Sequence, residues 1–224
     1  MGNNRSDKTK QSPGKVSLST VRRLSKYYRT LADLIKDGVE YVSSDELARI
    51  EGLTSAQVRK DFSFFGNFGK RGLGYTTLDL KQNIAEILGL DRQWNVAIIG
   101  AGNIGTALID YKEFAAHGFH LKMIFDNDPS KIGKKIKSLY VKDIETMSEE
   151  FEKEKIDIAI LAVPAEAAQQ AADRIVKTGV KAILNFAPRS LNVPEGTAVR
   201  QENTAMELEA LSYFITSKQK QEAS

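Results

Sequence analysis

The 224-residue sequence has no cysteine, only two histidines and no long run of apolar residues. Without cysteine there is no disulfide framework, no thiolate metal site and no cysteine nucleophile, which fits a reducing compartment. No apolar stretch approaches the roughly 18 residues of a membrane-spanning helix, and no secretory leader is visible. We therefore expect a cytoplasmic protein that does not enter a membrane.

Charge is divided unevenly along the chain, although the net charge is only +3. Residues 1–75 hold 14 Lys and Arg against 8 Asp and Glu, whereas residues 76–224 hold 18 against 21. A basic smaller part joined to a mildly acidic larger part indicates a polyanionic partner for the first. The length and a hydrophobic fraction of 42% suit two domains, each with its own core.

A glycine-rich turn after a buried strand is the most informative motif. The apolar run 96–99 is typical of a parallel strand buried on both faces, and it leads into G-x-G-x-x-G. In a dinucleotide-binding turn the first glycine permits the tight turn, the second lets the backbone approach a pyrophosphate, and the third lets helix and strand pack closely. The next helix offers its N-terminus to the phosphates. The predicted contacts are Gly100, Ala101, Gly102, Asn103, Ile104 and Gly105.

A carboxylate follows at the spacing that a dinucleotide site requires. The apolar run 121–125 ends in Asp126, 21 residues beyond Gly105. Asp126 there would accept hydrogen bonds from a ribose diol and repel a 2′-phosphate, so NAD(H) is favoured over NADP(H). The alternative is a strand–turn–helix with an accidental Asp in a loop. Lys131 is interpreted as a phosphate or ribose contact, and Tyr111 faces either the core or the ligand.

Alternating apolar runs and amphipathic segments after residue 90 predict an α/β fold, a doubly wound parallel sheet of the Rossmann type. Strands are expected at 94–99, 120–126, 136–141, 156–163, 180–186 and 198–201. Helices are expected up to 116 and over 144–154 and 165–178, with a last one from Thr204. The loops at the carboxyl ends of the strands, 100–105, 126–128, 163–164 and 185–188, should line the crevice. They add the candidate contacts Asn127, Val163, Pro164, Asn185, Phe186 and Ala187.

Groups for catalysis or metal binding are scarce. An NAD-dependent enzyme needs a proton donor or acceptor beside the nicotinamide. His117 and His120 lie where a helix ends and the second strand begins, at the end of the sheet away from the crevice. No His-rich segment or carboxylate cluster offers a metal site. A cofactor pocket without an obvious reaction suits a sensor and not an enzyme.

The basic N-terminal part predicts a helix-turn-helix. A first helix is expected from Ser19 to Gly38, with a buried stripe of Val21, Leu24, Tyr28, Leu31 and Ile35. Capping boxes at 43–46 and 54–57 open two short helices separated by a turn that contains Gly52. The second helix of such a pair enters a DNA major groove.

Polar residues on and after the second short helix are the candidate DNA contacts. On the helix they are Ser55, Gln57, Arg59 and Lys60; Arg59 and Lys60 cannot both read bases from one helical face, so one is expected to hold a phosphate. The glycine-rich, cationic segment 66–75 has the composition of a wing. Its expected contacts are Lys70, Arg71, Gly72 and Tyr75, although Tyr75 can instead pack at the base. The alternative is a helix-turn-helix that never touches DNA, with solvated cations.

These parts predict a linear domain order. It comprises a disordered tail (1–15), a winged-helix domain with a linker helix (16–89), an NAD(H)-binding domain (90–202), a C-terminal helix (203–217) and a short tail (218–224). The last helix carries an apolar stripe of Leu208, Leu211 and Ile215. We expect that stripe to dock on a partner subunit.

Several of these motifs, in one unbroken order over residues 16–216, resemble the Rex family of redox-sensing transcriptional repressors. The matching segments are 57–61, 71–75, 100–105, 128–133, 163–164 and 185–188. The resemblance implies a homodimer with a swapped last helix that binds palindromic double-stranded operator DNA and dissociates when NADH replaces NAD+. It also implies DNA contacts by Arg59, Lys60 and Arg71 and switch positions at Arg29 and Tyr111.

One position departs from the family pattern. The switch of the family usually includes an Asp at the start of the last helix, where this chain has Asn203. A neutral amide cannot pair with Arg29 as a carboxylate would, so a charge-based switch is in doubt here. Two other interpretations stay open: an NAD-dependent oxidoreductase with an N-terminal dimerisation module, and a CoA-binding-type domain, against which Asp126 speaks.

Overall fold

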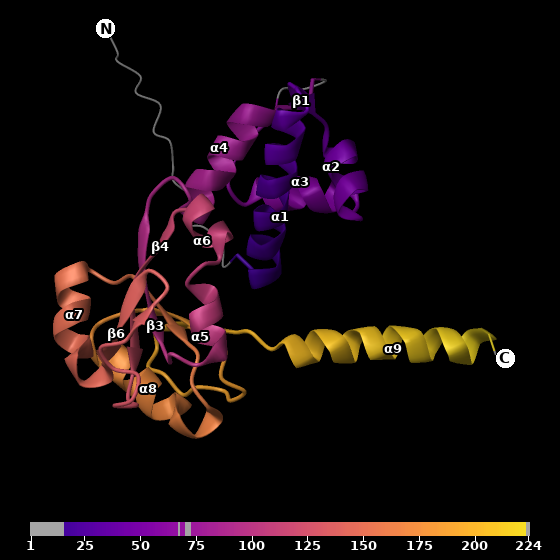
Figure 1. Ribbon diagram of the computed structural model, residues 1–224. Coiled ribbons are helices and arrows are strands. Elements are labelled where there is room, and N and C mark those ends of the chain that lie inside the picture. The colour runs from indigo at the N-terminus through magenta and orange to yellow at the C-terminus, as the bar shows by residue number, and fades with distance from the viewer. Residues whose placement is uncertain (1–15, 67, 70–72, 223–224) are drawn as a thin grey trace, which may run out of the picture. The chain divides into compact units, whose positions relative to one another are not determined.

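The computed structural model describes residues 16–66, 68–69 and 73–222 (Figure 1). The chain divides into two compact units between Arg92 and Gln93, and each unit is described by itself. The predicted tail 1–15 and the wing residues Lys70, Arg71 and Gly72 lie outside the described residues.

The N-terminal unit combines a helix-turn-helix with a short antiparallel ladder. Strand β1 pairs with β2, which brings the segment after the helix-turn-helix back beside the residues that precede it. No strand was expected at β1. The elements of this unit are α1 (Leu18–Lys36), β1 (Tyr41–Val42), α2 (Ser44–Glu51), α3 (Ser55–Ser63), β2 (Tyr75–Thr76) and α4 (Thr77–Leu88).

Side chains fix where the two short helices begin. At α2 the predicted capping box is confirmed, because Ser43 accepts from the backbone of Glu46 and Glu46 accepts from the backbone of Ser43. At α3 Thr54 accepts from the backbone N–H of Gln57, as predicted. A full capping box would also need the Gln57 side chain to accept from the backbone N–H of Thr54. That part of the prediction is wrong, because the Gln57 side chain turns to Asp61 instead and donates to it at 2.9 Å.

The buried stripe of α1 differs from the prediction at three positions, one of which is Ile35, which is only partly buried. Leu24 and Leu31 are fully buried as expected, but Val21 is 36% exposed and Tyr28 is only partly buried. The fully buried aromatic residue is Tyr27, which the predicted stripe omitted. Its ring packs edge-on against Phe62 of α3, with the ring centroids 5.4 Å apart. Burial of the polar hydroxyl at Tyr27 requires a partner, and a buried carboxylate supplies it.

That carboxylate is Asp61, which joins α1 to α3 and is fully buried. It accepts from Arg23 Nε at 2.6 Å, Arg23 Nη2 at 2.7 Å, Tyr27 Oη at 2.9 Å and Gln57 Nε2 at 2.9 Å. Burial alone would raise the pKa of Asp61, but donation from Arg23, Tyr27 and Gln57 holds the pKa below its usual value. A carboxylate has about four acceptor sites, so Asp61 is saturated.

We predict that Asp61→Asn destabilises the N-terminal unit. The substitution removes the charge that Arg23 faces and puts an N–H₂ group among donors, so the free energy of unfolding should fall by about 2–4 kcal/mol. Because the folded pKa of Asp61 is lowered, its contribution is fully present above the unfolded pKa of about 3.9 and is lost as pH falls further. Urea unfolding followed by far-ultraviolet circular dichroism, repeated across pH, measures both effects.

Asp33→Asn is the matched control, because Asp33 pairs with Lys36 on the same helix while both side chains are more than 70% exposed. That change should shift stability by no more than about 0.5 kcal/mol. Equal losses from the two variants would contradict the account of Asp61.

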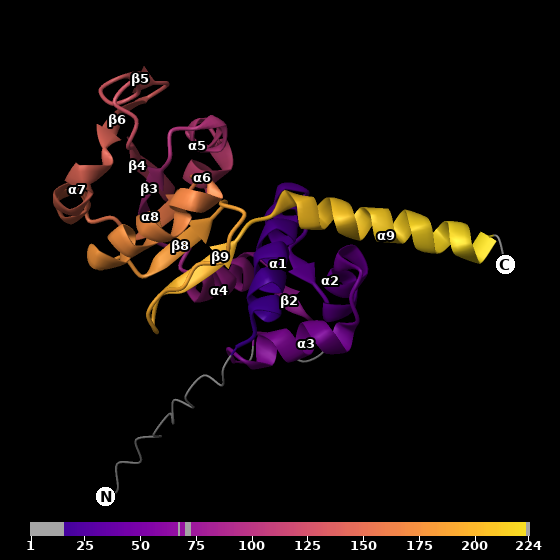
Figure 2. The ribbon, with the colours of Figure 1, turned by 90° about the horizontal axis from the view of Figure 1, so that it is seen from below.

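The C-terminal unit has the predicted doubly wound sheet. The strand order is β5-β6-β4-β3-β7-β8-β9; every neighbouring pair is parallel except β5 with β6. Figures 1 and 2 show helices on the two sides of this sheet. The elements are β3 (Trp94–Ile99), α5 (Asn103–Leu108), α6 (Lys112–Ala116), β4 (Phe119–Asp126), β5 (Lys135–Ile136), β6 (Leu139–Asp143), the 3₁₀ turn η1 (Ile144–Thr146), α7 (Met147–Glu154), β7 (Ile158–Leu161), α8 (Ala165–Lys177), β8 (Ala182–Asn185), β9 (Ala198–Gln201) and α9 (Thr204–Glu222).

Alternate residues of the central strands fill two separate cores. On β3, Ala97 and Ile99 belong to the core covered by α7 and α8, whereas Val96 and Ile98 belong to the core that includes residues of α5 and α6. Because a strand sends successive side chains to opposite faces, the apolar run 96–99 serves both layers. This is the burial on both faces that the run predicts.

Three differences from the sequence-based expectation go beyond shifts of one or two residues at the ends of an element. The predicted strand 136–141 is a hairpin instead: β5 and β6 are joined at Lys137, which has a φ of +54°. The helix after the glycine turn is broken into α5 and α6, with Tyr111 at the N-cap of α6. The last helix continues to Glu222 and does not end at 217.

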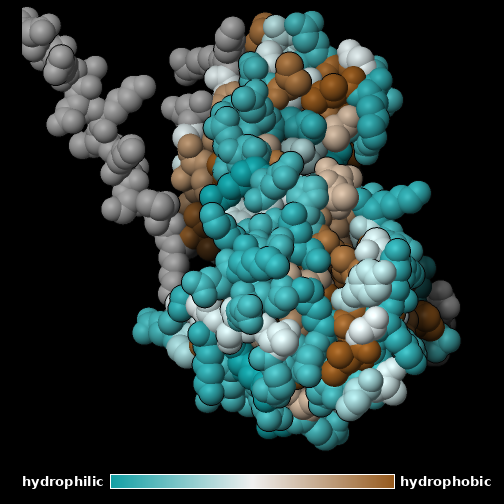
Figure 3. Space-filling view, turned by 60° about the vertical axis from the view of Figure 1, so that its left-hand side comes forward, coloured by the Kyte–Doolittle hydropathy of each residue, from teal (hydrophilic) through white to brown (hydrophobic). Residues whose placement is uncertain are grey.

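The described surface shows two notable features. On the face drawn in Figure 3, hydrophobic residues form small groups among larger hydrophilic areas. Helix α9, by contrast, exposes six large hydrophobic side chains, each at least 56% accessible: Met206, Leu208, Leu211, Tyr213, Phe214 and Ile215. In the described part of the chain, no helix is long and apolar enough to cross a membrane.

Candidate functional site: a dinucleotide pocket and a cationic helix

The glycine turn is shaped by steric limits at two of its three glycines. Gly100 has a φ of +107°, and a Cβ there would lie 2.3 Å from the carbonyl oxygen of Ala162. A Cβ on Gly105 would lie 1.9 Å from the carbonyl oxygen of Gly100. These contacts agree with the predicted tight turn at Gly100 and close packing at Gly105. At Gly102 an added Cβ meets nothing within 4 Å, so the space beside it is open to a ligand.

Asp126 closes β4 beside this turn and is 7% exposed. Its carboxylate accepts from the backbone N–H of Ala101 at 2.8 Å, the backbone N–H of Asp128 at 2.9 Å and Lys131 Nζ at 3.0 Å. Burial would raise the pKa of Asp126, but the N–H of Asp128, the Lys131 ammonium and the N–H of Ala101 hold the pKa below its usual value. Asp126 is thus an ionised acceptor with one of about four acceptor sites unoccupied by protein donors.

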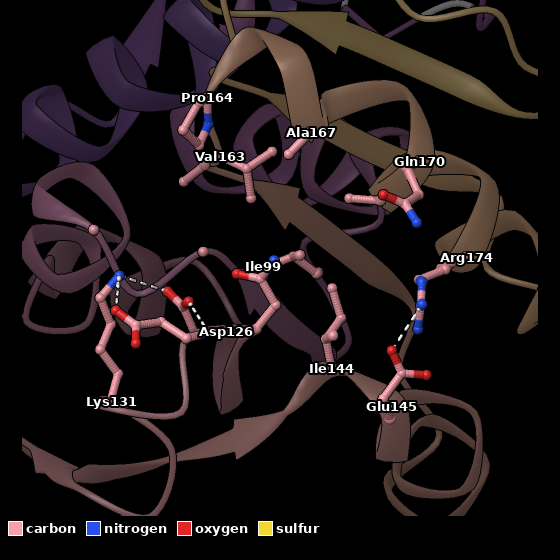
Figure 4. A pocket seen from close by; sticks show the side chains of 16 residues that line it. Ile99, Asp126, Lys131, Ile144, Glu145, Val163, Pro164, Ala167, Gln170 and Arg174 are labelled. Atoms are coloured by element: carbon pink, nitrogen blue, oxygen red, sulfur yellow. Dashed lines mark hydrogen bonds and ion pairs between the residues drawn. The ribbon is translucent and has the colours of Figure 1, made fainter.

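A pocket of about 510 Å³ lies between the turn and α8 (Figure 4). This volume falls within the usual range for small-molecule sites. Seven residues predicted from the sequence line it: Gly100, Gly102, Asp126, Asn127, Lys131, Val163 and Pro164.

Asp128, in the loop 126–128 that was expected at the crevice, also lines the pocket. Eight further lining residues were missed: Ile99, Ile144, Glu145, Ala162, Ala167, Gln170, Ala171 and Arg174. Those on α8 share one helical face, and their spacing of three and four residues could have revealed them. Ile144 and Glu145 follow β6, whose carboxyl end was misplaced with the predicted strand 136–141. Glu145 forms an ion pair with Arg174 at 2.7 Å. Its pKa is lowered by the hydrogen bond from Arg174.

The other predicted cofactor residues do not line this pocket. The backbone N–H of Ala101 is engaged by Asp126, and Asn103, Ile104 and Gly105 form the first turn of α5. Tyr111 is 53% exposed and stacks edge-on against Phe114 at 5.0 Å, so the core alternative for its side chain is wrong.

The loop after β8 is held by amide side chains. Asn185 is fully buried; its amide donates to the carbonyl of Arg189 at 2.8 Å and to Gln201 Oε1 at 2.6 Å. The amide of Gln201 donates to the carbonyl of Ala187 at 2.6 Å. The structure thus gives the Asn185 side chain the task of fixing this loop to β9. Direct ligand contact by Asn185, Phe186 and Ala187 stays a prediction.

Helix α3 presents two exposed cations. Arg59 and Lys60 are both exposed, and Arg59 Nη1 donates to Ser44 Oγ at 3.1 Å. Ser55 and Gln57 are partly buried. Tyr75 packs edge-on against Phe62 at 5.3 Å, which fits the packing alternative for this residue. DNA contact by these residues stays a prediction.

Neither histidine lines the pocket. Among the described residues no three His, Cys, Asp or Glu side chains form a group that could hold a metal ion. His120 lies opposite Asn95 near the amino ends of β4 and β3, whereas the pocket lies at the carboxyl ends of those strands. His117 follows α6 and bonds to the carbonyl of Glu113.

Comparisons with known proteins bear on both units. Residues 91–189 match the family described as "CoA binding domain", and residues 15–63 match "Putative DNA-binding protein N-terminus". The redox-sensing transcriptional repressor Rex of Carboxydothermus hydrogenoformans is 46% identical over 201 residues, which cover 90% of this chain and 97% of that protein. Rex of Pelotomaculum thermopropionicum is 47% identical over 207 residues, covering 92% and 97%.

The chain belongs to the Rex family. Two solved structures of the Rex-family repressor RSP extend the likeness to the fold. RSP in complex with β-NAD+ and operator DNA has a TM-score of 0.87 at 42% identity, covering 92% of this chain and 95% of RSP. RSP in complex with β-NADH has a TM-score of 0.83 at 40% identity, covering 92% and 97%. The Rex assignment confirms the predicted fold class and the resemblance drawn from the motifs.

The steric limits of the Rex glycine turn predict different outcomes for two alanine variants. Gly105→Ala should destabilise the C-terminal unit by several kcal/mol, because its Cβ collides with backbone. Gly102→Ala should keep wild-type stability, because its Cβ has free space, yet that Cβ should obstruct a pyrophosphate and weaken NADH binding at least tenfold. Thermal unfolding and NADH titration measure the two effects. A destabilised Gly102→Ala, or one with unchanged NADH affinity, would contradict this division.

Proposed function

We propose that this chain is a redox-sensing transcriptional repressor that binds palindromic operator DNA as a homodimer and dissociates when NADH replaces NAD+. The observation that carries the proposal is the likeness of one continuous chain to RSP both with NAD+ and operator DNA and with NADH. The ionised Asp126 in the pocket and the cationic face of α3 supply the chemistry for both ligands. Because both proposed ligands, operator DNA and NAD(H), are cytoplasmic, we propose that the protein acts in the cytoplasm.

The redox sensitivity follows from the charge of the ligand. NAD+ has a cationic nicotinamide ring and NADH a neutral one, so burying the NADH ring in a dry pocket costs less free energy. NADH would favour a closed dimer whose recognition helices no longer match half-sites about one DNA turn apart.

Helix α9 supports the homodimer. Its six exposed hydrophobic side chains lie on a helix with no described core residue, and such a surface marks an interaction site. A second copy of this chain, exchanging α9, would cover it. Two-fold symmetry of the dimer then accounts for a palindromic operator.

Two of the proposed switch residues, Arg29 and Asn203, form local hydrogen bonds in this structure. Arg29 is exposed, and its Nη1 donates to the carbonyl of Ser25 at 3.1 Å. Asn203 Oδ1 accepts from the backbone N–H of Ala205 at 3.1 Å, which caps the start of α9. We propose that Asn203 helps the switch through this cap and not through charge.

A gel-shift titration tests the proposed function. With operator DNA, the NAD+-loaded chain should bind, and replacing NAD+ by NADH should weaken binding at least tenfold, because the two forms favour different dimers. Indifference of the DNA complex to both dinucleotides would refute the redox proposal. Stabilisation by CoA but not by NADH in a thermal-shift assay would favour the CoA-binding alternative that the family match at 91–189 raises.

Substitutions on α3 separate base reading from phosphate contact. Arg59→Ala and Lys60→Ala should each weaken operator binding, by about 1–3 kcal/mol for whichever residue reads a base. The base reader should also lose sequence discrimination, whereas the phosphate contact should lower the salt dependence of binding. Filter binding to operator and mutated operator at several salt concentrations distinguishes them.

Arg49→Ala on α2 is the control and should leave operator binding unchanged. If neither Arg59→Ala nor Lys60→Ala changes affinity, α3 is not the recognition helix.

A further inference from the structure

An ion pair forms one end of the dinucleotide pocket. In Figure 4, Asp126 and Lys131 lie at one side of the pocket, and Glu145 and Arg174 lie at the other. Arg174 Nη2 and Glu145 Oε1 are 2.7 Å apart, with the side chains 33% and 66% exposed. The backbone of Glu145 is fixed as well, because its N–H donates to Asp143 Oδ1 at 3.0 Å.

Between the two sides the walls carry mostly apolar side chains. Ala167 and Ala171 of α8 line the pocket, and Ile144 lies across from α8 in Figure 4. Alanine side chains stop at Cβ and leave room for a ligand, whereas Gln170 of the same helix is polar and lies near Arg174 in Figure 4. A space bounded by small apolar side chains, with polar groups gathered at the Arg174 end, suits a flat aromatic ring.

The order of pyrophosphate, ribose and base in the dinucleotide indicates which aromatic ring would occupy this space. This step rests on the proposed function, in which the pyrophosphate lies at Gly102 and the adenosine ribose at Asp126. The base is attached to that ribose, on the side away from the pyrophosphate. On this placement the base would lie between Ile144 and the α8 residues of the lining, and its edge would face Glu145 and Arg174.

We propose that the Glu145–Arg174 pair recognises the 6-amino group of adenine. The bond to Arg174 leaves Glu145 Oε2 as a free acceptor, and Arg174 keeps further N–H donors. Adenine presents an amine donor beside a ring-nitrogen acceptor, the complementary pattern. Hypoxanthine has a carbonyl oxygen in place of the amine, so two oxygens would face each other at Glu145.

The ion pair is suited to ligand recognition more than to stability. Partly exposed ion pairs contribute little to folding, so neutral replacement should leave the fold intact. The chain offers a matched control in Lys142 and Glu150, which are 2.6 Å apart in the same unit and do not line the pocket.

The test compares NADH with its hypoxanthine analogue, which has the same riboses, phosphates and nicotinamide. In titrations of the full wild-type chain, NADH should bind about tenfold more tightly than the hypoxanthine analogue. The analogue lacks the amine, so it leaves the Glu145 acceptor without a donor. In Glu145→Gln the difference should shrink to about twofold, because an amide can turn either its N–H₂ or its oxygen toward the base. Arg174→Gln should also reduce the affinity difference between the two dinucleotides, because the ion pair that positions Glu145 is lost.

Glu150→Gln should keep the wild-type ratio. Equal binding of the two dinucleotides by the wild type, or an unchanged ratio in Glu145→Gln, would overturn the proposal while NADH binding itself stands. Failure of the wild type to bind either dinucleotide would instead refute the proposed function and this inference together.

Discussion

The close approach of the turn 100–105 to its neighbours is the constraint on which the sensing unit depends. Backbone oxygens of Ala162 and Gly100 occupy the places that side chains at Gly100 and Gly105 would need. Packed in this way, the turn brings the N–H of Ala101 to within 2.8 Å of Asp126. The carboxylate and the open face of Gly102 are thereby fixed at one edge of the sheet, where a ribose and a pyrophosphate can be held together.

Each unit contains a buried carboxylate, and the two differ in what they leave free. Asp61 receives four hydrogen bonds from Arg23, Tyr27 and Gln57, which saturate it and fasten α3 to α1. Asp126 receives three and keeps an acceptor site for a ligand. The same residue type is therefore structural in the N-terminal unit and faces the pocket in the C-terminal unit, and the number of donors around it decides whether an acceptor site stays open.

The features that depend on a local sequence pattern could be predicted from the sequence. The glycine turn, Asp126 and the alternation of strands and helices lie in continuous segments, and the structure has them as expected. Long-range partnerships were less accessible: Asp61 lies 38 residues from Arg23, so no periodicity marks it, and it explains why Tyr27 and not Tyr28 is buried. The pocket wall at Glu145 was missed because the hairpin before it was taken for one strand. The wing contacts at Lys70 and Arg71 stay predictions.

The central claim is that one dimer couples two ligands, and coupling of this kind is reciprocal. Calorimetric measurement of the NADH dissociation constant, with and without saturating operator DNA, tests it most directly. The account predicts that operator DNA raises the NADH dissociation constant by the same factor by which NADH raises the operator dissociation constant. An NADH dissociation constant that operator DNA leaves unchanged would contradict it.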